Sequence, residues 1–592
     1  MMPRNWAVYG RAGEGDVVNR KVCAISSRSR YLRRVYGTTF ALCMFVACVV
    51  TDAQSPVTTC DAMGIGSAHL FGDGPPVTIE SVATATAGSG AAAIPYCLVK
   101  VLAPQAIHIW VGLPMSDKWN GRWQSLGGGV YAGTISAPTS AVLGGYAGAT
   151  TDTGHTGGRP DLPVPSFDGS FGMLAPGVPN KPLQIDFAWR SEHLMAVLGK
   201  QLVRAFYGRG PAYSYWNGCS TGGRQGLRMA QDFPGDYEGV LAGAPAIHWD
   251  RFQAGQLWYQ VVQLRDNGGP IGSGNSATSR SKLSMATSKA VAACDLLDGV
   301  VDGVLTDPRD CPYSASADAT LTNASCAPSD PTCLTLTEAS AIDKMWQGPV
   351  CCAMHDHDGQ CRVRDVPSRL LFGMGNKRLW YPNERGTDLS GLGGVTPFPI
   401  ATEQPKFWVY FDPNWDWRTL DYANYLRFFK DSVARVGPLM ASDNPNLARF
   451  RNRGGKVILW HGFSDPLIVP GGTIDYYDAI TRRLGGGYQQ TQKFARLFMA
   501  PGVGHCGGGD GPQPQGLFEA LVSWVEKGSA PEQILAAKTV GGTTRTRPLC
   551  PYPAFARWTG TGSTDDAANF VCRASFGRSF SDDDGDEVDA SE

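Results

Sequence analysis

The sequence predicts an α/β fold in which a mostly parallel sheet is interrupted by a long insertion. Apolar, strand-like segments alternate with segments of helical period before residue 248 and again after residue 453. Between them, residues 249–452 lose this alternation and become rich in Gly, Pro, Cys and Trp. Because 592 residues exceed what one small core needs, we expect one large elaborated domain or two domains.

Five elements are expected in the first part of the chain. The alternating segment "IHIWVGLP" at 107–114 is typical of a strand. Residues 186–208 carry apolar side chains at a period close to 3.6 and predict a helix. A strand at 212–218, a helix at 222–234 and a buried strand at 239–246 follow.

The alternation returns after the insertion. The segment "KVILWHG" at 456–462 is typical of a buried parallel strand. Residues 471–485 predict a helix, and residues 494–506 predict a further strand that runs into a loop. We therefore expect the core of the protein to consist of residues 54–248 and 453–578.

The two ends of the chain differ from this core. Residues 1–53 predict a signal peptide with an over-extended front end, because basic residues precede a short apolar run that ends near Val50. That run is too short for a stable membrane span. We expect a secreted or periplasmic protein, with lipoprotein anchoring at Cys48 as an alternative. The acidic residues 579–592 predict a disordered tail.

Charge and cysteine content narrow the class of protein. The net charge is −1 and no basic stripe is present to neutralise phosphates, which excludes nucleic acid as a partner. Thirteen of the 16 cysteines follow residue 53, and in an exported chain this predicts disulfides. Because thirteen is odd, at least one thiol is left over, and we look for it among Cys351, Cys352 and Cys361.

Ser220 is the candidate nucleophile, at the centre of a G-x-S-x-G pattern between a predicted strand and a predicted helix. Strand, turn and helix form the nucleophile elbow of the α/β-hydrolase scaffold. A serine hydroxyl needs a base to remove its proton and an acid to orient that base. On this scaffold the partners follow in the order Ser, Asp, His, which selects Asp465 in "HGFSDP" and His505 in "GVGHCGG".

Ordinary structural roles compete with these assignments, since a helix cap, a turn former and a loop histidine would look the same in sequence. His461, His155 and His193 are the other histidines considered for the base. His461 would have to share its loop with the acid. His505 lies on a separate, later loop, as the order requires.

Cysteines flank two members of this candidate triad. Cys219 precedes Ser220, and Cys506 follows His505. A Cys219–Cys506 disulfide would hold the serine and the imidazole within the tolerance that general-base catalysis needs. The chain-entropy model gives such a long loop roughly 5 to 6 kcal/mol of stabilisation as an upper figure. The alternative is two unrelated structural thiols.

These motifs resemble the tannase and feruloyl esterase family of secreted α/β-hydrolases, which is marked by a Cys-Ser, Asp, His-Cys arrangement. The resemblance extends from about Cys60 to Cys572 and includes "GCSTGGRQGL", "TDTGH", "DFAWRSEH", "DPNWDWRTLDY" and "RTRPLCPYP". It implies a carboxylic ester hydrolase with an α/β-hydrolase core and a lid domain inserted over residues 249–452. Triad chemistry needs no organic cofactor.

The oxyanion of an acyl-transfer reaction needs backbone N–H donors. Thr221, the residue after the nucleophile, offers one. The resemblance implies that the second comes from the glycine loop "LGGGVYAG". Gly128 is our choice within that loop, with Gly127 and Gly129 as alternatives.

The resemblance also implies a structural calcium ion in the loop between Cys294 and Cys311. The ligands would be the carboxylates of Asp295, Asp298 and Asp302 and the carbonyls of Val300 and Val304, an oxygen-only set that suits this hard cation. The alternative is an acidic turn clamped by a Cys294–Cys311 disulfide. Similar family positions imply three further pairs, Cys60–Cys97, Cys326–Cys333 and Cys550–Cys572.

The family acts on galloyl, feruloyl and related aromatic acyl esters, so the resemblance implies a small-molecule or plant-polymer aromatic ester as substrate. It also includes a mono(2-hydroxyethyl) terephthalate hydrolase, from which this chain departs at Thr221 and Ile468, where that enzyme has a glutamate and an aromatic residue. Trp380 and Arg385 are candidates for acyl recognition, with a structural role as the alternative. A hypothesis of another class is a secreted aromatic-ligand or cell-wall binding protein with a decayed hydrolase site.

Overall fold

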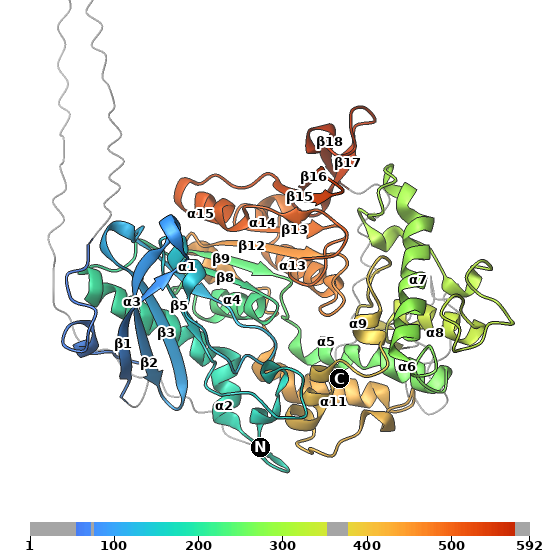
Figure 1. Ribbon diagram of the computed structural model, residues 1–592, viewed down its shortest axis with the longest axis horizontal. Helices are drawn as coiled ribbons and strands as arrows, with labels where there is room; N and C mark the ends of the chain where they lie inside the picture. Colours follow the sequence, from blue (N-terminus) through green and yellow to red (C-terminus); the bar gives the residue numbers. More distant parts are fainter. Residues whose placement is uncertain (1–54, 73–75, 352–376, 575–592) are drawn as a thin grey trace, which may run out of the picture. The chain divides into compact units, whose positions relative to one another are not determined.

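The computed structural model describes residues 55–72, 76–351 and 377–574, all within one compact unit (Figure 1). The predicted signal peptide at 1–53 and the predicted tail at 579–592 lie outside the described residues. The described residues include most of the predicted core, 54–248 and 453–578. The side chains of Cys351, Cys352 and Cys361 lie outside them as well.

A mixed sheet forms the centre of the fold. Its strands follow the order β1-β2-β3-β5-β4-β8-β9-β12-β13. Neighbours from β5 to β13 run parallel, and β1, β2, β3 and β5 pair antiparallel. The strands are β1 (Thr78–Ala87), β2 (Ile94–Ala103), β3 (Ile107–Pro114), β4 (Arg122–Leu126), β5 (Ala147–Thr151), β8 (Tyr213–Cys219), β9 (Gly239–Gly243), β12 (Lys456–Gly462) and β13 (Ala495–Ala500).

Helices cover both faces of this sheet, and the strand β12 buries alternate side chains against each face. Side chains of successive strand residues point to opposite faces. Val457 and Leu459 join the core cluster that contains Tyr477, whereas Ile458 joins the cluster that contains Trp524. An almost continuous apolar strand is therefore buried on both sides, as in other parallel sheets. The covering helices are α3 (Ser191–Tyr207), α4 (Thr221–Asp232) and α13 (Pro470–Leu484) on one face and α15 (Leu517–Lys527) on the other.

The predicted helix at 186–208 begins with a different geometry. Residues Asp186–Arg190 form one wider π-helical turn before the α-helical α3 starts. The helix then ends at Gly208, whose φ of 74° is the left-handed conformation that glycine adopts without strain.

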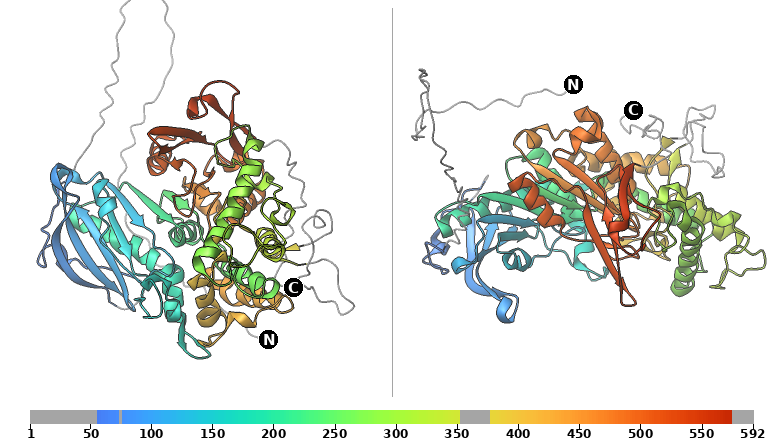
Figure 2. Two further views of the ribbon diagram at one scale, coloured as in Figure 1. Left: turned by 45° about the vertical axis from the view of Figure 1, so that its right-hand side comes forward. Right: turned by 90° about the horizontal axis from the view of Figure 1, so that it is seen from above.

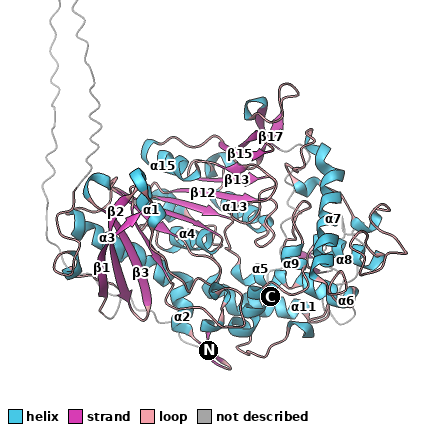
Figure 3. Cartoon of the chain, in the orientation of Figure 1, coloured by secondary structure: helices cyan, strands magenta, loops and turns pink. Residues whose placement is uncertain are grey.

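In the segment between β9 and β12, residues 244–455, the regular elements that the structure describes are mostly helices (Figure 3). In the amino-acid sequence, this segment is recognisable only by its loss of strand and helix alternation. Its helices are α5 (Trp249–Gln256), α6 (Trp258–Asp266), α7 (Ser276–Cys294), α8 (Leu336–Gln347), α9 (Ser390–Gly393), α10 (Pro399–Gln404), α11 (Tyr425–Met440) and α12 (Ala448–Asn452).

Short strands flank α15, one before it and four after it, and the last of them lie beside the inserted segment (Figure 2). The strand β15 pairs with β16, and β17 pairs with β18. Arg547 on β16 reaches Asp302 in the loop after α7, which connects the C-terminal part to the insertion. The strands are β14 (Gln513–Pro514), β15 (Ile534–Val540), β16 (Thr543–Leu549), β17 (Ala554–Trp558) and β18 (Phe570–Ala574).

Candidate active site

Ser220 lies in the sharp turn between β8 and α4. Its φ of 62° and ψ of −125° are unusual for a residue with a side chain. A Cβ atom on Gly218 would lie 2.6 Å from the Gly222 carbonyl carbon, so both glycines of the pattern are needed for the close approach. This strained strand-to-helix turn is the geometry that holds a nucleophile out from the sheet.

Asp465 and His505 come from the loops after β12 and β13, and they are in contact. His505 Nδ1 lies 2.7 Å from Asp465 Oδ2. The other carboxylate oxygen accepts the backbone N–H groups of Leu467 at 2.8 Å and Ile468 at 3.0 Å. The carboxylate is thus fixed on both sides, and it faces the imidazole as the orienting acid of a triad does.

Asp465 is fully buried, so its charge state has to be explained. Burial raises the pKa of its carboxyl, but the charge of His505 and the hydrogen bonds from His461 and His505 outweigh burial. The resulting pKa lies well below the ordinary value. Asp465 is therefore an anion throughout the neutral range and can stabilise a proton on His505.

A disulfide connects the two halves of this arrangement. Cys219 is bonded to Cys506, with their Cα atoms 5.9 Å apart. This bond places the backbone of Ser220 next to the backbone of His505. The contacts of the described residues include no hydrogen bond between the Ser220 hydroxyl and His505, a bond that in free enzymes is often lengthened and tightens when substrate binds.

The structure forms the four other cysteine pairs that the sequence and the family resemblance suggested. These pairs are Cys60–Cys97, Cys294–Cys311, Cys326–Cys333 and Cys550–Cys572.

The three rival histidines have other partners. His193 Nδ1 contacts Asp236 at 2.8 Å, and His155 stacks on the ring of Phe171. Burial lowers the pKa of His155 to about 4, so it stays neutral. His461 also touches Asp465, but both of its ring nitrogens are occupied by buried partners. Of this set only His461 and His505 contact Asp465, and both nitrogens of His461 are occupied. His505 is therefore the histidine beside the acid that keeps its second nitrogen for a substrate-facing role.

The glycine loop after β4 places its amides differently from our choice in sequence. Gly128 N–H donates to the Gln225 side-chain oxygen at 2.9 Å, and Gly127 N–H donates to the Asn217 carbonyl at 3.0 Å. Within the described part of the chain, Gly129 N–H makes no hydrogen bond. Of the three glycine amides, Gly129, an alternative that the sequence left open, is therefore the one available to a ligand, and Gly128 is engaged by protein.

The buried carboxyl of Glu192, which was not among the site residues predicted from sequence, supports the glycine loop through Gln225. Gln225, whose oxygen accepts from Gly128, donates through its amide nitrogen to Glu192 on α3. Glu192 is fully buried, and burial raises the pKa of its carboxyl to about 7 despite the nearby charge of Arg224. Glu192 and Gln225 lie inside the family motifs "DFAWRSEH" and "GCSTGGRQGL". Their place in these motifs was the sequence feature that could have indicated them as site residues.

The raised pKa of Glu192 predicts a pH-dependent stability. Its pKa of about 7 in the folded protein exceeds the ordinary value of 4.5, so the folded state keeps a proton that the unfolded state loses. Stability should therefore fall as pH rises from 4.5 to 7, by about 3 kcal/mol for this group. In Glu192→Gln this contribution should be absent, so the variant should gain stability relative to wild type between pH 5 and pH 8. Urea unfolding at both pH values measures the difference.

Loss of hydration also raises the pKa of the buried Asp186 and Asp250 and of the half-buried Asp478 to about 6. The comparison of variant with wild type isolates Glu192 from these groups. An equal change in the two proteins between pH 5 and pH 8 would contradict the assignment.

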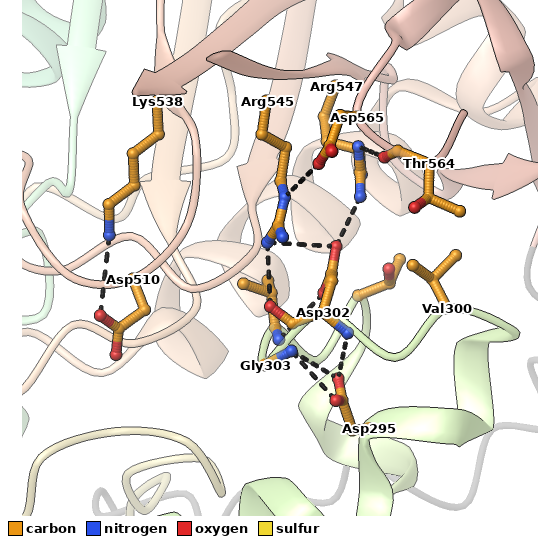
Figure 4. A network of polar contacts seen from close by, with 12 residues as sticks. Asp295, Val300, Asp302, Gly303, Asp510, Lys538, Arg545, Arg547, Thr564 and Asp565 are labelled. Carbon is orange, nitrogen blue, oxygen red and sulfur yellow. Dashed lines mark hydrogen bonds and ion pairs between the residues drawn. The ribbon is translucent and has the colours of Figure 1, made fainter. Parts of the chain in front are cut away.

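The loop proposed for calcium has its acidic side chains engaged by protein. Asp295 accepts the backbone N–H groups of Asp302 and Gly303. Asp302 accepts Arg547 at 2.5 Å and lies 3.5 Å from Arg545, both on β16 (Figure 4). Among the described residues, no group of three or more acidic, His or Cys side chains is arranged to hold a metal ion.

As arranged here, the calcium ligands suggested by the sequence do not fit a calcium cage, because a guanidinium occupies the outer oxygen of Asp302. Asp298 accepts the backbone N–H groups of Val300 and Thr306, and Val304 N–H donates to Asp302. The calcium ion stays a prediction, and no step of the reaction depends on it.

Trp380 and Arg385, our candidates for acyl recognition, contact protein. Trp380 is buried and lies against Gly255 and Gly472. Arg385 donates to the Tyr313 carbonyl at 3.2 Å and lies over the ring of Trp346. These contacts agree with the alternative that Trp380 and Arg385 have a structural role.

Comparisons with known proteins agree with this geometry. The family model described as tannase and feruloyl esterase matches residues 96–573. A probable feruloyl esterase of Arthroderma benhamiae is 36% identical over 80% of this chain and 83% of its own. The mono(2-hydroxyethyl) terephthalate hydrolase of Piscinibacter sakaiensis is 31% identical over 87% of this chain and 91% of its own.

Solved structures give the same result. The crystal structure of feruloyl esterase B from Aspergillus oryzae matches with a TM-score of 0.68 and 25% identity, covering 84% of this chain and 97% of that chain. Tannin acyl hydrolase from Aspergillus niger shares the fold, with a TM-score of 0.69. No helix within the described residues is long and apolar enough to cross a membrane. The chain therefore belongs to the tannase and feruloyl esterase family and is a carboxylic ester hydrolase with an α/β-hydrolase fold.

Proposed function

We propose that this protein is a secreted serine esterase that cleaves aromatic acyl esters of the feruloyl, hydroxycinnamoyl or galloyl type. The observation that carries the proposal is the 2.7 Å contact between His505 and a buried, charged Asp465, on a backbone that a disulfide joins to the Ser220 turn. Disulfides among the described residues suit an oxidising compartment and support export.

The reaction follows from these positions. His505 removes the proton from the Ser220 hydroxyl as its oxygen bonds to the ester carbonyl carbon, and Asp465 stabilises the imidazolium that forms. The bond to the alcohol then breaks, and His505 gives its proton to the leaving oxygen. Water, deprotonated by His505, attacks the acyl-enzyme, and the acid leaves as Ser220 regains its proton.

Negative charge develops on the carbonyl oxygen in both steps. Thr221 N–H, at the start of α4, is the first proposed donor, and the positive end of this helix adds to it. Gly129 N–H is the second, since the neighbouring Gly127 and Gly128 amides are already bonded within the protein. Glu192 and Gln225 keep the loop in that register by holding Gly128.

The acyl group is proposed from the relatives. Several of them are named feruloyl esterases, and one is named a terephthalate ester hydrolase. Thr221 and Ile468 depart from the pattern of the terephthalate ester hydrolase, and Ile468 is a buried residue of the loop that carries Asp465. Mono(2-hydroxyethyl) terephthalate is therefore the second candidate substrate.

A hydrolysis panel tests this function. For methyl ferulate, methyl gallate, chlorogenate and mono(2-hydroxyethyl) terephthalate, we expect the highest kcat/KM on one of the first three, at least about tenfold above the last, a difference of about 1.4 kcal/mol in transition-state binding. A fluorophosphonate probe should label the peptide that contains Ser220. An inert protein that takes up no label would favour the aromatic-ligand binding hypothesis, and a preference for the terephthalate ester would favour the second candidate.

A further inference from the structure

His461 is a buried histidine that the proposed mechanism does not use. It lies near the end of β12, four residues before Asp465, and its side chain is fully buried. Its Nε2 lies 3.1 Å from Asp465 Oδ2 and 2.8 Å from the Ile468 carbonyl oxygen. Its Nδ1 lies 2.8 Å from the Thr473 hydroxyl at the start of α13.

These partners define which nitrogen of His461 carries a proton. The neighbours of Nε2 are a carboxylate and a carbonyl, and both can only accept a hydrogen bond. Nε2 must therefore be protonated and donate to both. The Thr473 hydroxyl, which can donate or accept, pairs with Nδ1, so both ring nitrogens of His461 have a partner.

His461 and His505 share one oxygen of the catalytic carboxylate. Asp465 Oδ2 receives His505 at 2.7 Å and His461 at 3.1 Å, while Oδ1 receives two backbone amides. Without His461, the contact with His505 would be the remaining side-chain bond to Oδ2. The two imidazoles approach from different elements, so together they set the direction in which Oδ2 faces.

His461 also holds the backbone of the acid loop. The Ile468 carbonyl that it binds belongs to the residue whose own N–H donates to Asp465 Oδ1. One side chain thus fixes the carboxylate and the turn that carries it. The inserted segment contributes on the far side, where the Asn383 side chain donates to the Asp465 main-chain oxygen at 3.1 Å.

We propose that His461 is a positioning residue for ester hydrolysis, which holds Asp465 Oδ2 in line with His505 Nδ1. The proposal rests on the function proposed above. The role is to hold the acid that orients the base, and His461 itself touches neither the substrate nor Ser220. Residues that orient the groups in direct contact with a reacting centre change rates about 10- to 100-fold when they are removed.

The test compares substitutions that separate this role from ordinary packing. In His461→Leu, which keeps an apolar side chain but no donor, we expect kcat on the preferred ester to fall about 10- to 100-fold, with KM changed less than about threefold. In His461→Gln, the side-chain amide can still donate toward Asp465. This variant should recover most of the lost kcat.

A second variant approaches His461 from its other nitrogen. Thr473→Val removes the hydrogen-bond partner of Nδ1, so the imidazole loses one of the contacts that fix its orientation toward Asp465. We expect a fall in kcat that is smaller than in His461→Leu and in the same direction. If His461→Leu does not fold, Thr473→Val and His461→Gln still decide between the two roles.

His193→Leu is the matched control, because it removes another imidazole–carboxylate contact, with Asp236, away from the triad. It should lower the melting temperature and leave kcat unchanged. Ser220→Ala is measured alongside. If Ser220→Ala matches wild type, the proposed function fails and the positioning role fails with it. If Ser220→Ala is inactive and His461→Leu keeps wild-type kcat, only the positioning role is overturned.

Discussion

Replacement of Ser220 by alanine is expected to lower kcat/KM on the preferred aromatic ester by about 10⁴- to 10⁶-fold, because it removes the atom that forms the acyl-enzyme. Within the described residues the Ser220 hydroxyl makes no hydrogen bond, whereas the Ser220 backbone makes the bonds that hold the elbow, so alanine should leave the turn intact. Initial rates over a range of ester concentrations measure the effect, and unchanged melting would show an intact fold.

Ser214→Ala is the matched control for this prediction. Ser214 lies on β8, the same strand that leads to the elbow, and it is buried. Its loss should change kcat/KM less than about twofold. Equal activity of Ser220→Ala and Ser214→Ala would remove Ser220 from the mechanism.

Breaking the Cys219–Cys506 disulfide should have the second largest effect, on stability and activity together. The bond closes a loop of 287 residues, for which the chain-entropy model gives roughly 5 to 6 kcal/mol as an upper figure. The double variant Cys219→Ser, Cys506→Ser should melt at a lower temperature. It should also lose kcat by more than about tenfold at temperatures where it is folded, because Ser220 and His505 are then free to separate.

The pair Cys550–Cys572 offers a comparison, since it closes only 22 residues and lies in the last strands of the fold. The same model gives its removal roughly 3 kcal/mol. Its double serine variant should therefore melt earlier than wild type but keep its kcat. Calorimetry and steady-state rates measure both variants. Full kcat in the folded Cys219→Ser, Cys506→Ser variant would show that the bond stabilises the fold without positioning the site.

The parallel part of the fold was readable from sequence because buried parallel strands are short, apolar and bounded by turns. The strands β8, β9, β12 and β13 lie within or close to the predicted segments. Strand β1 was not predicted, since "TIESVATATA" is mostly exposed and small and lacks an apolar face. Helix α7 was missed for a related reason, because Ser, Thr, Ala and Lys dominate it and leave no apolar stripe.

The candidate site was predictable to a similar degree. The order of Ser220, Asp465 and His505 along the chain follows the topology of the scaffold, so motifs were sufficient to select them. The oxyanion loop was different. Whether Gly128 or Gly129 is open depends on Gln225, a side chain 97 residues away whose hydrogen bond no local pattern reveals. The pairing of Asp302 with Arg547, 245 residues away, is equally invisible to spacing.

The position of the inserted segment has a consequence for how such enzymes diversify. It takes the place of an ordinary crossover between β9 and β12, which are direct neighbours in the sheet, and Ala244 N–H already donates to the Trp460 carbonyl as the chain departs. A parallel crossover needs only about a dozen residues. The other residues of the inserted segment are not needed to connect β9 to β12. The length and the helices of the inserted segment can therefore change between relatives, provided that residues such as Asn383 still meet the acid loop. We expect that an exchange of inserted segments between relatives transfers ester preference while Ser220, Asp465 and His505 stay where they are.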